Sequence, residues 1–147
     1  MFSKKLIASS TIAIACVSSA LAQSTLGEAI DMGAEKVLKD EFLTFLPVTM
    51  KAVTSTGRAV ATLKFKADGD LSGYVESREG YGTSGSFGTW TMDESGKKCI
   101  DETLSKWNMN WKECTYIFKI SGRYFRVSED LNRDQKITFY DFKIRDN

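Results

Sequence analysis

Near the C-terminus, oxygen-bearing side chains recur at a spacing that could wrap a metal ion. If Asp130 is counted as position 1 of a twelve-residue loop, side-chain oxygens fall at positions 1, 3, 5, 9 and 12 and a backbone carbonyl falls at position 7. Calcium takes six to eight oxygen ligands, and a loop of this spacing directs them toward one point. The candidate metal ligands are Asp130, Asn132, Asp134, Lys136 through its carbonyl, Thr138 and Asp141. The sequence therefore predicts a candidate calcium site over 130–141.

The same segment, 130–142, resembles an EF-hand loop, and the dockerin variant of that loop most closely. The resemblance implies calcium as the bound ion. Gln135 stands where the EF-hand loop has glycine, at the point where the chain must turn sharply. A plain β-hairpin, with strands over 124–129 and 136–144 and a turn at 132–134, is the alternative. A hairpin of this kind is compatible with a weakly held ion.

Cys99 and Cys114 are the two cysteines that remain once Cys16, which lies in a predicted export signal, is set aside. In an oxidising compartment an even number of cysteines indicates a disulfide. This bond would close a loop of about 15 residues and contribute roughly 3 kcal/mol in the chain-entropy model. Neither cysteine belongs to a Cys-x-x-Cys motif, so we expect a structural bond rather than a redox-active pair.

The composition excludes several kinds of catalysis. The chain contains no histidine, which removes Ser-His-Asp and Cys-His catalysis and His-ligated zinc. Carboxylates remain, and Glu76, Glu79, Asp101 and Glu102 could pair across strands for glycosidase-like hydrolysis. Because carboxylates at strand ends and turns are usually solvated, a carboxylate-dependent hydrolase ranks behind a non-enzymatic function.

Two tryptophans, Trp107 and Trp111, lie between the cysteines. At the tip of a hairpin held by the disulfide they could be exposed and contact a protein or glycan partner. Packing in the core is the other interpretation, since large aromatic rings on alternating strands mostly fill a core.

The N-terminal residues 1–22 have the three parts of a secretory signal peptide in the required order. Two lysines precede an apolar stretch over 6–17, and Ala20-Leu21-Ala22 is a small-x-small cleavage site. The protein is therefore expected in the periplasm or outside the cell. Lipidation at Cys16 is a lesser alternative, because the residues before it loosely resemble a lipoprotein box.

The remaining residues, 23–147, are long enough for one domain with a single core. The chain has 20 basic and 19 acidic residues, so no strong field exists to attract nucleic acid. No later segment approaches the roughly 20 apolar residues of a transmembrane helix. We expect a monomer.

The elements that must position these residues are one helix and a series of strands. A helix is expected from a Thr25/Glu28 capping box to a stop before Pro47. Beyond it, short runs of β-branched and aromatic residues alternate with turn residues, as in Ala61-Leu63-Phe65. The sequence thus predicts a mainly β domain. It would be an N-terminal helix followed by an antiparallel meander of seven to eight strands, closing as a small barrel or sandwich.

A further pattern runs through the middle of the chain. Its members are Asp68-Gly69-Asp70-Leu71-Ser72-Gly73, Gly88-Thr89-Trp90, Cys99, Trp107, Trp111, Cys114 and Tyr116. In this order they resemble the small exported bacterial family catalogued as domain of unknown function 995. The resemblance covers about residues 40 to 128 and implies a calycin-like β fold and a periplasmic location. It implies no catalytic residues.

Taken together, the residues favour an exported, non-enzymatic β-domain that binds or scaffolds an unknown envelope protein or glycan. A calcium-binding protein that uses the 130–141 loop is the first alternative. A carboxylate-dependent hydrolase is the second.

Overall fold

The computed structural model describes residues 25–144. The predicted signal peptide and Cys16 lie outside these described residues. The elements in chain order are α1 (Leu26–Asp31), β1 (Glu35–Lys36), α2 (Lys39–Thr44), β2 (Val48–Val53), β3 (Ala59–Phe65), β4 (Asp70–Ser77), β5 (Thr83–Met92), β6 (Lys97–Leu104), β7 (Met109–Ile120), β8 (Arg123–Val127) and β9 (Thr138–Ile144).

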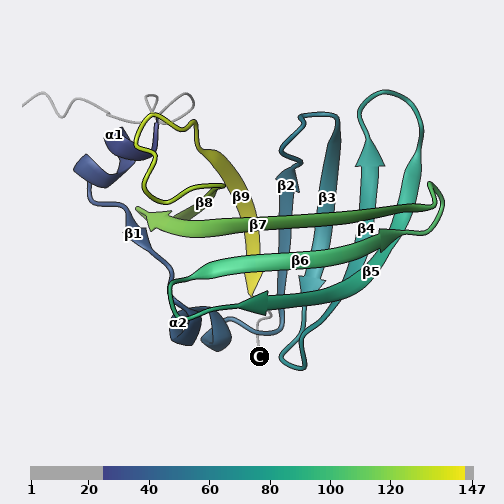
Figure 1. Cartoon of the computed structure of the whole chain (residues 1–147), viewed down its shortest axis with the longest axis horizontal. Helices are drawn as coiled ribbons and strands as arrows, with labels where there is room; N and C mark the ends of the chain where they lie inside the picture. Colours follow the sequence, from purple (N-terminus) through teal and green to yellow (C-terminus); the bar gives the residue numbers. More distant parts are fainter. Residues whose placement is uncertain (1–24, 145–147) are drawn as a thin grey trace, which may run out of the picture.

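Strands β2 to β9 form a closed, eight-stranded antiparallel barrel. Each strand from β2 to β8 pairs with the next one along the chain, and the loop between β8 and β9 is the longest of these connections. The pairing of β9 with β2, from Val48↔Ile144 to Lys51↔Asp141, completes the closure. The short β1 adds to the free edge of β7 beyond β6. In Figure 1, β6 and β7 cross the upright strands β2, β3 and β4. The predicted antiparallel meander is confirmed, and its closed form is a barrel.

Alternation along the strands decides which side chains face the interior. On β6, for example, Ile100 and Leu104 are buried, whereas Asp101 between them is exposed. Inward-facing residues of all the strands form the main core together with α2. The buried residues of this core are Val37, Phe42, Val48, Met50, Leu63, Phe65, Leu71, Trp90, Met92, Ile100 and Ile117.

Two glycines allow neighbouring strands to approach closely where the sheet coils. A Cβ on Gly73 would lie 2.0 Å from the carbonyl oxygen of Thr62, and one on Gly88 would lie 2.0 Å from that of Asp101. No side chain fits at either position. Glycine in a strand interior commonly marks such a bend or close backbone contact.

One end of the barrel is closed by aromatic side chains of the α2 segment. Phe42 is fully buried and its ring lies 5.3 Å from that of Trp90, edge to face. The Trp90 indole donates a 2.9 Å hydrogen bond to the carbonyl of Lys66. Phe45 contacts the stacked pair Tyr124 and Phe142. This end is therefore filled, and α2 holds it closed.

The predicted N-terminal helix is confirmed, but its expected extent to Pro47 is wrong, because the chain forms two short helices on either side of β1. The capping box at Thr25 and Glu28 is present as expected. The α1 helix then ends in a Schellman motif, in which Ala34 N–H donates to the Ala29 carbonyl and Gly33 N–H to the Ile30 carbonyl. Gly33 takes the left-handed conformation that this motif requires, with φ of 96°.

The α1 helix covers the outer face of β7, β8 and β9 and builds a second, smaller core there. Leu26 and Ala29 are fully buried against Phe118 and Phe125, whose rings stack 5.5 Å apart. Of the helices in residues 25–144, none has the length and apolar character that a membrane crossing requires.

Candidate binding site at the open end of the barrel

The end of the barrel opposite α2 is open and contains a cavity of about 540 Å³, which we call the mouth cavity. Residues in and beside the β2–β3, β4–β5 and β6–β7 connections line it. Figure 1 shows these connections away from α2. The residues that line it are Thr54, Thr56, Arg58, Ala59, Val75, Ser77, Glu79, Tyr81, Glu102, Leu104, Trp107, Met109 and Trp111. This volume lies within the roughly 300–1,000 Å³ typical of small-molecule sites, and much of the lining is apolar or aromatic.

Both tryptophans that the sequence singled out line this mouth cavity. Trp111 lies on β7 and packs partly buried against the core, whereas Trp107 lies in the tight β6–β7 turn. The indole N–H of Trp107 is buried and has no hydrogen-bond partner among the described residues. A buried donor without an acceptor costs free energy, so it indicates a place where a ligand or water would bind.

Glu102 is the charged residue at the inner end of the mouth cavity. It projects inward from β6, is only 5% exposed, and accepts a short hydrogen bond from the Ser86 hydroxyl. Burial raises the pKa of the Glu102 carboxyl and the nearby Glu113 charge raises it further, while the Ser86 bond and Lys98 oppose the shift. The carboxyl is therefore protonated more readily than an exposed glutamate.

Beyond Glu102 lies a smaller inner cavity, of about 40 Å³, within the barrel. It has room for a few atoms only. Glu102, Trp111 and Thr54 line both this inner cavity and the mouth cavity, so their side chains separate the two. The other polar residues around the inner cavity are Lys98, Glu113, Arg126 and Tyr140.

Arg126 is a buried cation whose partners are all protein groups. Its guanidinium donates to the Glu113 carboxylate at 2.8 Å and to the Val53 carbonyl at 2.6 Å. It also lies 5.9 Å from the centre of the Tyr140 ring. The buried phenol of Tyr140 has a raised pKa, chiefly because of desolvation. Arg126 and Glu113 therefore compensate one another within the barrel.

Lys98 is the second buried cation, and unlike Arg126 it has no ion-pair partner among the described residues. The residue is 4% exposed, and its ammonium lies 4.4 Å from the centre of the Phe65 ring. Among residues 25–144 it forms no hydrogen bond or ion pair. Desolvation, with a smaller contribution from Arg126, lowers the pKa of Lys98 to about 8. Its ammonium therefore lies in the interior without a protein anion in contact.

The structure does not bring the predicted calcium ligands together. The Asp130 carboxylate pairs with Lys36 at 2.5 Å, and Asn132 accepts a bond from the Asp134 N–H within a local turn. Asp141 lies away from this turn on β9, where it is paired with Lys51. In the part of the chain that the structure describes, no group of three or more acidic or cysteine side chains could hold a metal ion.

The segment around 128–137 instead forms a long loop that docks against α1. The carbonyls of Arg133 and Gln135 accept the free N–H groups of Gly27 and Leu26 in the first turn of the helix. The Arg133 guanidinium also pairs with Asp31 at 2.6 Å. These contacts fix the loop against the helix. Lys136, the predicted backbone ligand, forms an isolated β-bridge with Thr25, and Thr138 begins β9.

The carboxylates proposed for hydrolysis have different surroundings. Glu76 and Glu79 are exposed, and Asp101 faces outward and pairs with Lys112 at 2.8 Å. Glu102 faces the barrel interior, and the exposed Glu79 lines the same mouth cavity from the β4–β5 connection. The neighbouring carboxylate that raises the pKa of Glu102 is Glu113, which the sequence interpretation did not include.

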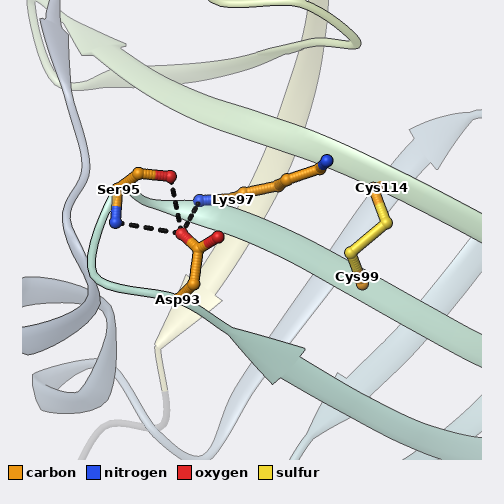
Figure 2. Close-up of a disulfide and its surroundings, with 5 residues drawn as sticks. All are labelled: Asp93, Ser95, Lys97, Cys99 and Cys114. Atoms are coloured by element: carbon orange, nitrogen blue, oxygen red, sulfur yellow. Dashed lines mark hydrogen bonds between the residues drawn. A yellow bond between two sulfur atoms is a disulfide. The ribbon is translucent and has the colours of Figure 1, made fainter.

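The predicted disulfide is present between Cys99 and Cys114, which face one another on β6 and β7 (Figure 2). It lies on the outer side of the barrel wall, since the residues on either side of Cys99 point inward. The β5–β6 turn next to it is held by the Asp93 carboxylate, which accepts bonds from Ser95 and from the Lys97 N–H. These bonds, the Ser95 hydroxyl bond first, lower the pKa of Asp93.

Sequence analysis missed the interior polar group made by Ser86, Lys98, Glu113 and Arg126. A signal was present on β6, where Lys98, Ile100, Glu102 and Leu104 occupy one face of the strand. Charged residues in phase with buried apolar ones indicate a polar barrel interior.

Comparison of the chain with protein-family models, with curated proteins and with solved structures finds no match. The resemblance to the exported family and to the EF-hand loop therefore stays a hypothesis.

Proposed function

We propose that the protein is an exported, non-enzymatic binding protein that takes a small amphipathic molecule into the mouth cavity. The observation that carries this proposal is the open, largely apolar cavity of about 540 Å³ with a buried, unpartnered Trp107 N–H in its wall. A packed barrel would leave neither the space nor the free donor. Export is the part of the proposal that depends on the sequence alone.

The lining supports a ligand with an apolar body. Val75 and Leu104 are buried side chains whose surfaces contribute to the mouth cavity, beside the rings of Trp107 and Trp111. Burying apolar ligand surface against them would contribute about 25 cal/mol per Å² before the costs of association. Tyr81, 69% exposed at the rim, could cover a bound molecule.

The test is a titration with decanol, a neutral amphiphile, followed by tryptophan fluorescence. Two of the three tryptophans line the mouth cavity, so we expect saturable changes in emission. Trp111→Ala should weaken decanol binding at least about tenfold, because it removes a wall of the cavity.

The matched control is Phe87→Ala, which removes an aromatic ring that is 56% exposed on the outer face of β5. This variant should bind decanol as the wild type does. No saturable binding to the wild type, or equal losses in the two variants, would contradict a site in the mouth cavity.

A further inference from the structure

The unpartnered polar groups around the two cavities are both hydrogen-bond donors. The Trp107 N–H opens on the mouth cavity, and the Lys98 ammonium borders the inner cavity. Neither has an acceptor among the described residues. The carboxylates nearby are engaged, because Glu102 accepts from Ser86 and Glu113 accepts from Arg126. Each of these two donors therefore lacks a bonded acceptor, and next to a buried cation the best acceptor is an anion.

We infer that the ligand is an amphiphile with an anionic head group, which pairs with Lys98 while the apolar body fills the mouth cavity. This inference rests on the proposed function. It assigns Lys98 as the residue that selects the charge of the ligand.

The arrangement of charges around Lys98 explains why it, and not Arg126, would serve the ligand. The groups that face it are Arg126, Glu113, Glu102 and Tyr140. Arg126 is held by two hydrogen bonds to the protein, so an anion would have to break them. Lys98 has a flexible side chain, and its ammonium lies over the Phe65 ring without a hydrogen bond to any described residue.

The separation between the cavities must admit the head group. Glu102 and Trp111 form most of it, and the Glu102 carboxyl is held there by a bond to Ser86. A head group that enters beside Glu102 would meet a carboxyl whose pKa is raised by burial, while the nearby Lys98 supplies the positive charge.

The experiment compares three molecules with one apolar chain and different head groups: decanoate, decanol and decyltrimethylammonium. Calorimetry on the full mature protein at pH 7 should give at least about tenfold tighter binding for decanoate than for decyltrimethylammonium. Lys98→Met should remove this preference, whereas Phe87→Ala, on the outer face of β5, should retain it. Lys98→Arg, which keeps the charge, should retain the preference.

The dependence on pH is a second readout. Because the pKa of Lys98 is about 8, decanoate should bind about tenfold more weakly at pH 9 than at pH 7. The Lys98→Met variant should show no such change over the same range.

The outcomes separate this inference from the proposed function. If none of the three molecules binds, the proposed function itself fails. If all three bind equally well, or if Lys98→Met leaves the decanoate preference intact, the mouth cavity is a binding site but the assignment of Lys98 is wrong.

Discussion

At the scale of single residues, Lys98 has opposite effects on stability and on the proposed binding. Burial disfavours its charged form, which is why its pKa falls from 10.5 to about 8. The folded state therefore holds a proton on Lys98 less firmly than the unfolded chain does. At neutral pH the charged lysine is a cost to folding, and a functional role is a physical reason to keep it.

Replacing Lys98 with methionine should stabilise the protein. We expect the free energy of unfolding to rise by about 2–3 kcal/mol at pH 7, the order set by the lowered pKa of this buried group. Between pH 8 and 10.5 the folded wild type binds fewer protons than the unfolded chain, so wild-type stability rises and the advantage of the variant should shrink. Urea unfolding across this range measures the difference. A difference that stays constant with pH would show that Lys98 does not cause it.

Residue types and spacing predicted several residues of the mouth cavity correctly, but the predicted calcium ligands do not come together. Trp107, Trp111, Glu79 and Glu102 were identified as candidates, and all four line the mouth cavity. The calcium pattern failed to assemble because Asp141 belongs to a strand, and strand pairing carries it away from Asp130. Spacing along the chain describes a site only where the backbone conformation is the assumed one.

At the scale of elements, the expectation of one long helix overlooked a stop signal. The apolar spacing continues past Gly33, but the glycine occupies the left-handed position of a Schellman motif. Periodicity reports which face would be buried, whereas the end of a helix depends on one backbone conformation.

Gly33→Ala separates the two descriptions of this segment. In a continuous helix, alanine would stabilise by roughly 1 kcal/mol. With a left-handed φ of 96° and open space around the position, only backbone strain remains, and we expect a loss of about 1 kcal/mol. Thermal unfolding of this variant decides the sign. A gain in melting temperature would favour the continuous helix.

Strand alternation predicted the antiparallel barrel strands well, but not how they coil. Coiling depends on contacts such as the one at Gly88, whose missing Cβ leaves space for the backbone of Asp101 and Glu102. Closure depends on the pairing of β2 with β9, the first and last strands of the barrel along the chain. Neither strand carries a sequence pattern that identifies the other as its partner. These are long-range packing relations, so a local pattern cannot contain them.

Gly88→Ala should therefore cost about 2 kcal/mol or more, because the added methyl would overlap backbone atoms that cannot move separately. It should also disturb decanol binding, since Glu102 lies opposite Gly88. Gly85→Ala on the same strand is the control. The nearest atom to its added Cβ is the movable Ser105 hydroxyl at 3.2 Å, so we expect a change under about 1 kcal/mol. Similar losses in both variants would contradict the role given to Gly88.

At the scale of the whole molecule, the two ends of the barrel have different tasks. The α2 end is filled by edge-to-face rings that include Phe42, Phe65 and Trp90. The other end keeps its aromatic rings around an open cavity. Packing at the first end stabilises the fold, and this stability allows the second end to remain incompletely packed.

We therefore expect substitutions at the α2 end to lower stability without changing ligand affinity, and substitutions at the open end to do the reverse. Phe42→Ala should lower the free energy of unfolding by about 3–5 kcal/mol, since it leaves a cavity at a fully buried position. Wherever the variant remains folded, its affinity for decanol should be unchanged.

Trp107→Phe removes an N–H that has no partner in the described structure, so the free energy of unfolding should stay the same or rise slightly. Its decanol affinity should nevertheless fall, because the decanol hydroxyl loses the Trp107 N–H as a hydrogen-bond donor in the mouth cavity. Urea unfolding and calorimetry on the same samples test both halves, and a Trp107→Phe variant that loses stability but not affinity would show that this ring belongs to the core.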